Sequence, residues 1–117
     1  MRTSRRSTRV GGQIREEISR AVQRVVKDPR IQGVTFTQVK LSKDLRYARV
    51  YYSVIGEDQR LEEARAGLQS AKGVIRREVG RNLPLRYVPE IEFFFDNSLG
   101  YAEHIESLLR QIHDAET

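Results

Sequence analysis

The stretch GVTFTQVKLSKDLRYARVYYSV, residues 33–54, constrains the fold most, because it holds two runs of strand-forming residues separated by a short polar segment. Valine, threonine, tyrosine and phenylalanine are favoured in strands. They predict strands at about Val34–Leu41 and Arg46–Val54. The SKDL sequence between them predicts a turn, so we expect the two strands to form an antiparallel hairpin.

Alternation along the second strand separates a buried face from an opposite face. One face carries Ala48, Val50, Tyr52 and Val54, and the other carries Tyr47, Arg49, Tyr51 and Ser53. The first strand alternates less regularly, since its early apolar residues point opposite to its late ones, and this predicts a bulge or a change of exposed face. Tyr47 and Tyr51 could stack on nucleic-acid bases, but we expect a helix to cover them.

Helical periodicity flanks the hairpin on both sides. From about Arg9 to Lys27, apolar residues recur every three or four positions. This helix is expected to end near Asp28, because Pro29 disfavours helical geometry in the residue before it. Beyond the hairpin, Asp58 is a fair helix cap. The apolar stripe that follows continues through Val79.

The remaining segments predict one more strand, one more helix and an N-terminal arm. Glu90–Phe95 reads as a strand with Ile91, Phe93 and Phe95 on its buried face. The last helix should carry an apolar face made of Tyr101, Ile105, Leu108, Leu109 and Ile112. Residues 1–8 are polar and lack periodicity, so we interpret them as a flexible basic arm. Residues 9–115 would then form one domain.

The predicted order is helix, strand, strand, helix, helix, strand, helix, with the helices on one face of a small α+β sheet. Its core, αββααβ, is the order of a type II KH domain, with one extra C-terminal helix. KH domains clamp single-stranded nucleic acid at a GXXG loop between two helices. Here Ala71-Lys72-Gly73 stands at that place. Because glycine costs about 1 kcal/mol in a helix interior, it predicts a kink or a close approach.

Positive charge follows the predicted kink. The chain has 21 Lys and Arg against 16 Asp and Glu, a formal net charge of +5, and most of the cations are arginine. Beyond the kink, the cations on the side away from the apolar stripe are Lys72, Arg76, Arg77 and Arg81. In one interpretation these cations face a polyanion. In the other they form a solvated surface, and Gly73 merely permits close helix–sheet packing. Periodicity alone leaves both interpretations open.

Catalytic and metal chemistry find little support in the sequence. The chain has no cysteine, which removes the thiolate ligands of structural zinc sites. His104 and His113 lack metal-ligand spacing, and Ser42 and Asp44 read as turn residues rather than a nucleophile and its partner. We therefore expect no enzyme activity, no metal and no cofactor. No apolar run approaches membrane-spanning length and no export signal is evident, so we expect a cytoplasmic protein.

Four blocks of the chain occur in the order seen in the bacterial ribosome-binding factor A family. They are KDPRIQGVTFTQVKLSKDLRYARVYYSV, SAKGVIRREVG, LRYVPEIEFFFDNS and HIESLLRQI. The chain resembles this family from about Arg6 to Ile112. The most specific pieces are Asp28-Pro29-Arg30, Leu41–Leu45, Ala71-Lys72-Gly73 followed by Ile75-Arg76, and Leu85–Glu90.

The resemblance implies a type II KH-like fold in which a helix–kink–helix, with Ala71 and Gly73 at the kink, replaces the GXXG loop. It implies binding to 16S rRNA within the free small (30S) ribosomal subunit, assistance in late 16S rRNA maturation and processing, and importance in the cold. It places Lys72, Arg76, Arg77 and Arg81 on the RNA-facing helix. We add Arg86 of the connector and the N-terminal Arg5, Arg6 and Arg9 as candidate RNA contacts, because guanidinium groups suit phosphates.

Two alternatives remain beside an assembly factor for the small subunit. One is a general KH-like RNA-binding protein, and the other is a protein-interaction module whose charge serves only solubility. Ribosomal proteins or other assembly factors are further candidate partners. We expect a monomer, because no helix shows a surplus apolar face. Binding through several phosphates should weaken steeply with salt, whereas a protein partner should respond weakly.

Overall fold

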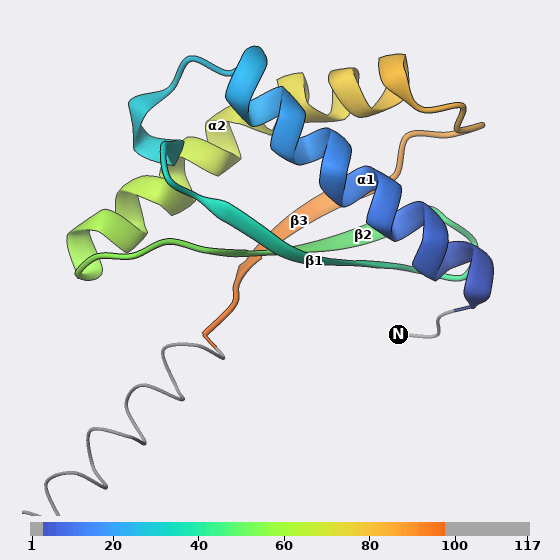
Figure 1. The fold of residues 1–117 in the computed structure, drawn as a ribbon, viewed down its shortest axis with the longest axis horizontal. Coiled ribbons are helices and arrows are strands. Elements are labelled where there is room, and N and C mark those ends of the chain that lie inside the picture. Colours follow the sequence, from blue (N-terminus) through green and yellow to red (C-terminus); the bar gives the residue numbers. More distant parts are fainter. Residues whose placement is uncertain (1–3, 98–117) are drawn as a thin grey trace, which may run out of the picture.

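In the computed structural model, which describes residues 4–97, two long helices pack on the same face of a three-stranded sheet (Figure 1). The elements are α1 (Arg5–Arg24), the 3-10 helix η1 (Pro29–Ile31), β1 (Thr35–Leu41), β2 (Tyr47–Ser53), α2 (Asp58–Asn82) and β3 (Glu90–Phe95). The predicted α+β class is confirmed. The predicted C-terminal helix lies outside the described residues.

The sheet has the order β1-β2-β3, in which β1 is antiparallel and β3 is parallel to β2. The predicted hairpin is therefore confirmed, and each strand begins and ends within one residue of its expected bounds. The register shifts between Phe36, which pairs with Tyr52, and Gln38, which pairs with Tyr51. This shift is the predicted bulge. Because the bulge interrupts the alternation of β1, Phe36 before it and Leu41 after it are both buried on the same side of the sheet.

The turn between β1 and β2 is held by its own side chains. The Ser42 hydroxyl donates to the Asp44 carboxylate at 2.6 Å, and the Arg46 backbone N–H donates to the same carboxylate oxygen at 3.1 Å. These hydrogen bonds lower the pKa of Asp44, and the one from Ser42 has the largest effect. Ser42 and Asp44 are thus turn residues, as predicted.

The hydrophobic core lies between the sheet and the two helices. Its fully buried side chains come from every element and include Ile14, Ile18, Ile31, Leu41, Val50, Leu68, Ile75, Val79 and Ile91. The predicted inner face of β2 is confirmed, since Ala48, Val50 and Tyr52 are buried. Phe95 is a correction, because it is 41% exposed. It sits at the last position of β3, where its ring packs roughly perpendicular to that of Tyr52, with the ring centroids 5.8 Å apart.

Helix α1 begins at Arg5 rather than at Arg9, so Arg5 to Thr8 do not belong to an arm. Ser4 and Ser7 cap the helix reciprocally: the Ser7 backbone N–H donates to the Ser4 hydroxyl at 3.1 Å, and the Ser4 N–H donates to the Ser7 hydroxyl at 2.6 Å. This arrangement is a capping box in which serine takes the usual place of glutamate. It satisfies helix N–H groups that would otherwise lack partners, and it orders a segment that looked structureless.

Helix α2 is one continuous helix of 25 residues, so the predicted separation into two helices at Ala71–Gly73 is wrong. The reason is that glycine keeps its backbone N–H and C=O, so the helical hydrogen bonds can continue through it, at a cost in entropy. A bend remains, because the green and yellow halves of α2 run in different directions in Figure 1. Apart from its own helix backbone and chain neighbours, no atom of residues 4–97 lies within 4 Å of a Cβ added to Gly73, so close packing against another element does not explain this glycine.

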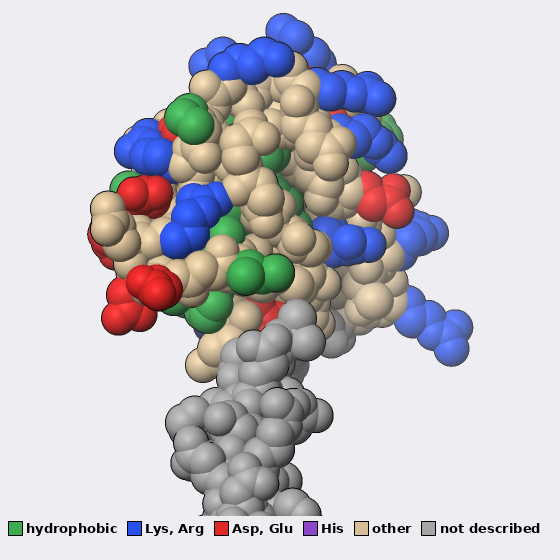
Figure 2. Space-filling view, turned by 60° about the vertical axis from the view of Figure 1, so that its left-hand side comes forward, with side chains coloured by type: hydrophobic (Ala, Val, Ile, Leu, Met, Phe, Trp, Pro, Cys, Tyr) green, Lys and Arg blue, Asp and Glu red, His purple; other side chains and the backbone are tan. Residues whose placement is uncertain are grey.

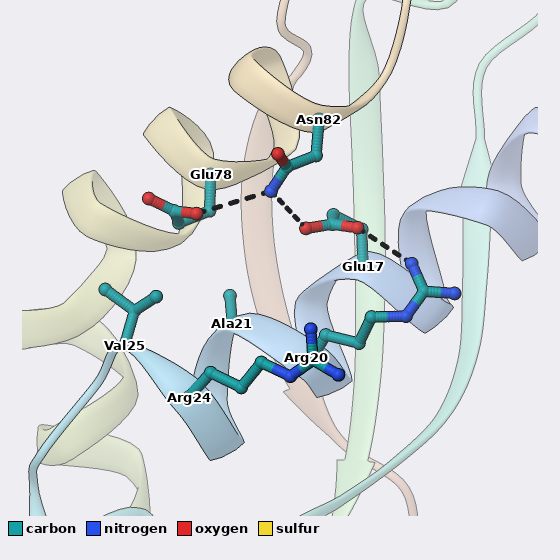
Figure 3. A pocket seen from close by; sticks show the side chains of 7 residues that line it. All are labelled: Glu17, Arg20, Ala21, Arg24, Val25, Glu78 and Asn82. Carbon is teal, nitrogen blue, oxygen red and sulfur yellow. Dashed lines mark hydrogen bonds and ion pairs between the residues drawn. The ribbon is translucent and has the colours of Figure 1, made fainter.

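A polar cluster joins α1 to the last turn of α2 (Figure 3). The Glu17 residue is 5% exposed. Its carboxylate accepts hydrogen bonds from the Asn82 amide at 2.6 Å and from the Arg20 guanidinium at 2.9 Å. Arg20 also approaches Glu16 at 3.5 Å, so one guanidinium group pairs with both glutamates. A buried carboxylate is tolerated only when it is paired in this way, and the pairing fixes the point at which the chain leaves α2.

Asp28-Pro29-Arg30, one of the blocks behind the family resemblance, is a structural element. The Asp28 carboxylate accepts the Arg30 backbone N–H at 2.9 Å and also binds the Arg30 guanidinium through several contacts. The side chain of Arg60 on α2 donates to the backbone carbonyls of Arg30 and Gln32. The carboxylate caps η1, and Arg60 holds the loop against α2.

Candidate nucleic-acid interface

The four predicted cations of α2 do not form one free surface, because Arg76 is part of the scaffold. Its Nε donates to the Pro89 carbonyl oxygen at 3.1 Å, and its Nη2 donates to the Val88 carbonyl oxygen at 3.2 Å. The same guanidinium lies 3.3 Å from the Glu90 carboxylate. Arg76 therefore ties α2 to the start of β3.

Of the other three predicted cations of α2, Arg77 and Arg81 are exposed and Lys72 is half-buried. Arg81 lies 3.7 Å from Glu78, with its side chain 69% exposed, and such surface pairs contribute little. Lys72 borders a hollow along β3 that also contains Glu90 and Glu92. Arg77 is exposed and has no hydrogen-bond or ion-pair partner among residues 4–97. It is the cation of this set that is most available to a ligand.

A second region gathers more positive charge than α2 does. The first turns of α1, the β1–β2 turn and the connection from α2 to β3 enclose a groove of about 700 Å³, here called the basic groove. Five cations line it, namely Arg6, Arg9, Lys43, Arg46 and Arg86, and the one acidic residue in its lining is Asp44.

The basic groove brings together three of the predicted RNA-binding residues, Arg6, Arg9 and Arg86, from the two ends of the domain. Arg5 is exposed in the same first turn of α1 but does not line the groove. Lys43 and Arg46 were missed by sequence reasoning. Lys43 lies within the SKDL turn and Arg46 directly follows it, and a cation in or beside a turn carries no signal that it faces a distant segment.

The start of α1 is electrostatically unusual, because its first turn contains arginines and no acidic residue. The N-terminus of a helix carries partial positive charge, so a cation there is unfavourable by about 0.3–1 kcal/mol. A bound anion would reverse the sign of that interaction, since backbone N–H groups and side chains would then face an opposite charge. The positions of Arg5 and Arg6 are therefore more favourable when a phosphate is bound at the N-terminus of α1 than when that N-terminus has no anion beside it.

Exposed aromatic side chains lie beside the groove. Tyr87 lines it and is 56% exposed, with the guanidinium carbons of Arg46 and Arg86 each 5.4 Å from its ring centroid. Tyr47 on β2 is 57% exposed, so no helix of residues 4–97 covers it, and the expected burial is wrong. Tyr51 is half-buried against Phe94, with ring centroids 5.7 Å apart.

Lys and Arg side chains are prominent on one part of the molecular surface. On the face drawn in Figure 2, they line the top and much of the right-hand margin, whereas at the left and at the right they also lie beside Asp and Glu side chains. Positive charge gathered on one side of a protein attracts a polyanion.

The described part of the chain offers no other obvious chemistry. Within residues 4–97, no three Asp, Glu or His side chains lie together in a way that could hold a metal ion. His104 and His113 lie outside the described residues. None of the helices in residues 4–97 combines the length and the apolar character that crossing a membrane requires.

The fold and the groove define a small α+β protein with a cation-lined surface suited to a polyanion. A family model described as ribosome-binding factor A matches residues 6–109. The chain therefore belongs to the ribosome-binding factor A family, as its sequence blocks predicted.

Individual relatives agree with this assignment. A ribosome-binding factor A from Desulfatibacillum aliphaticivorans is 46% identical over 112 residues, which cover 96% of this chain and 91% of the relative. Another from Citrifermentans bemidjiense is 49% identical over 108 residues, with 92% and 91% covered. The crystal structure of ribosome-binding factor A from Thermus thermophilus has a TM-score of 0.67 at 26% identity and covers 75% of this chain and 93% of that one.

A further structural relative was placed on a ribosomal subunit. A model of Thermus thermophilus ribosome-binding factor A, fitted into the cryo-EM map of a complex of that protein with the 30S subunit, has a TM-score of 0.65 at 25% identity. It covers 78% of this chain and 96% of its own. These values show the same overall fold as the one described for residues 4–97.

Proposed function

We propose that this protein is a ribosome-associated assembly factor that binds the free small ribosomal subunit through contacts to 16S rRNA. Family membership supports this proposal, as does the related protein fitted into a 30S complex. The structural observation that carries it is the basic groove, where five cations and one acidic residue converge from three separated segments. A surface of this kind fits a ribose-phosphate backbone.

The proposed mechanism is non-covalent. The groove cations neutralise phosphates and release their counterions. Binding then favours the rRNA conformation for which the protein has the higher affinity, so late maturation and processing of 16S rRNA would be assisted without any bond being made. Loss of that conformation in the mature subunit would release the protein. We further propose that it acts in the cytoplasm as a monomer, beside ribosomal proteins and other assembly factors, and most importantly in the cold.

A KH-like contact at the bend of α2 is the second part of the proposal. Gly73 is exposed and has open space around it, so an RNA backbone could approach the helix there more closely than at any residue with a side chain. Arg77 lies one turn further along the same helix. We assign Lys72 and Arg77 to this contact, keep Arg81 as a peripheral cation, and assign Arg76 to the scaffold instead.

Binding to isolated small subunits at increasing salt tests the proposal. Each phosphate contact contributes about 0.7–0.9 to the slope of log affinity against log salt. The variant Arg9→Ala/Arg86→Ala should therefore bind more weakly and lower the slope by about 1.4–1.8. The matched control, Arg24→Ala/Arg65→Ala, removes the same charge from two exposed residues outside the groove.

Three results would count against the proposal. Absence of binding to small subunits by the parent protein would reject it outright. A flat salt response would favour the protein-interaction module. Equal affinity for subunits and for unrelated RNA would favour a general RNA-binding protein.

A further inference from the structure

Two exposed tyrosines face a small pocket beside the basic groove. Tyr47, at the start of β2, and Tyr87, in the connection before β3, line a pocket of about 180 Å³ together with Arg46, Val88 and Glu90. We propose that this pocket binds one unpaired nucleobase of the RNA strand whose phosphates occupy the basic groove. The proposal rests on the RNA-binding function proposed above and names the kind of RNA that the site takes.

The pocket and the groove are adjacent, because Arg46 and Tyr87 line both. A strand with its phosphates along the groove cations would therefore reach the pocket without leaving the protein surface. The guanidinium groups of Arg46 and Arg86 already lie 5.4 Å from the Tyr87 ring. They can contact a phosphate or stack on a base beside that ring, since guanidinium and aromatic planes both accept stacked bases.

The chemistry of the pocket fits a base better than it fits a phosphate. Its walls are two aromatic rings and the apolar side chain of Val88, and its remaining charged residue besides Arg46 is Glu90. A carboxylate repels a phosphate, but it accepts hydrogen bonds from the N–H groups of a base edge. The Arg76 guanidinium lies 3.3 Å from the Glu90 carboxylate.

A base inside a duplex could not reach this pocket. In an A-form helix the bases stay stacked on each other, and the major groove is too narrow for side chains to read. Unpaired bases can instead turn outward and stack on tyrosine. The site therefore selects single-stranded or looped RNA, which distinguishes it from a surface that binds any phosphate backbone.

The other aromatic side chains on the open face of the sheet, Tyr51 and Phe94, do not offer an equivalent site. Phe94 stacks on Tyr51, with ring centroids 5.7 Å apart, and Arg49 lies 6.0 Å from the Phe94 ring. Phe94 is 38% exposed and lines neither the groove nor the pocket. It is therefore a suitable control for the loss of an exposed aromatic ring.

The experiment compares the full-length chain and its variants by fluorescence anisotropy with a labelled single-stranded oligoribonucleotide and with the duplex of the same sequence. Tyr47→Ala and Tyr87→Ala should each weaken binding to the single strand by roughly 5- to 150-fold, the loss expected for one base–aromatic stack. Their affinity for the duplex should stay near that of the parent. Tyr47→Phe, Tyr87→Phe and Phe94→Ala should bind the single strand as the parent does.

The proposal is overturned if the alanine variants bind the single strand like the parent, or if they lose single-strand and duplex binding equally. Binding of the same proteins to small subunits separates this failure from that of the proposed function. A parent that binds subunits while its tyrosine variants keep full single-strand affinity rejects only the base pocket. A parent that binds single strands through the two tyrosines but ignores subunits rejects only the ribosomal role.

Discussion

The side chain of Arg76 on α2 donates to the carbonyl oxygen of Pro89 at 3.1 Å and so joins the long helix to the residue that precedes β3. Pro89 is fully buried. The neighbouring Arg77 makes no comparable contact with residues 4–97. Two adjacent arginines, which a sequence pattern treats alike, thus have different physical roles.

Replacing these two arginines one at a time should separate stability from binding. Arg76→Ala leaves the Val88 and Pro89 carbonyl oxygens without this donor, and we expect it to lower the free energy of unfolding by about 1–3 kcal/mol. Arg77→Ala should change stability by less than about 0.5 kcal/mol but weaken subunit binding. Urea unfolding followed by circular dichroism and a subunit-binding assay measure the two effects. Equal stability of the two variants would contradict the scaffold role of Arg76.

Two glycines of α2 should respond oppositely to alanine. Gly73→Ala adds a methyl group in open space and should raise the free energy of unfolding by about 0.5–1 kcal/mol. Gly67→Ala should lower it by about 1–3 kcal/mol, because the new Cβ would lie 2.7 Å from the Cγ2 of Ile31. Thermal unfolding of both variants checks the signs. A Gly73→Ala variant that is more stable yet binds subunits less well would support a close approach of RNA to the bend.

Asp28 should make stability depend on pH. The side-chain hydrogen bond from Arg30 is the largest cause that lowers the pKa of Asp28 below its ordinary value of 3.8. The folded state therefore favours the ionised carboxylate. Its stabilisation is complete above the ordinary pKa and disappears as the pH falls through the lower pKa of the folded state.

Asp28→Asn removes the charge but keeps a side chain that can cap η1. We expect the variant to melt at a lower temperature than the parent at neutral pH. The difference should shrink as the pH falls below about 4. Melting curves recorded across the acid range test this expectation. A difference that stayed constant with pH would show that the charge of Asp28 is not the cause.

Asp44 should weaken RNA binding, because it is the one acidic residue that lines the basic groove. Hydrogen bonds from Ser42 and from the Arg46 backbone lower the pKa of Asp44, so it is ionised at neutral pH. Asp44→Asn should tighten binding to RNA by roughly two- to fivefold, the range expected for a charge interaction screened by solvent. Glu63→Gln, an exposed residue on α2 outside the groove, serves as the control with the same change of charge. Unchanged or weaker binding by Asp44→Asn would indicate that phosphates do not lie near the turn.

Local patterns predicted the elements of this fold well, because each strand and turn is determined by neighbours in the sequence. The hairpin, the bulge after Phe36 and the strand Glu90–Phe95 follow from alternation and turn chemistry. The start of α1 was missed because Ser7 takes the place of the glutamate that usually completes a capping box. The effect of Gly73 was overestimated, because one glycine weakens a helix without interrupting its hydrogen bonds.

The candidate site could be predicted only in part, since it depends on packing between distant segments. Arg6, Arg9 and Arg86 were expected to bind RNA, but no pattern connects them with Arg46. Likewise, alternation along β2 placed Tyr47 on the outer face but could not show that Tyr87 lies next to it. The scaffold role of Arg76 depends on two backbone carbonyls more than ten residues away.

The basic groove has walls from the beginning, the middle and the end of the described chain, and this order affects when it can work. The ribosome synthesises a chain from its N-terminus, so the walls supplied by Arg6 and Lys43 emerge long before the wall supplied by Arg86. An unfinished copy that ends before Pro84 has only two of the three walls. The complete set of groove cations therefore comes together only after the segment that carries Arg86 has been synthesised and has folded against the start of α1.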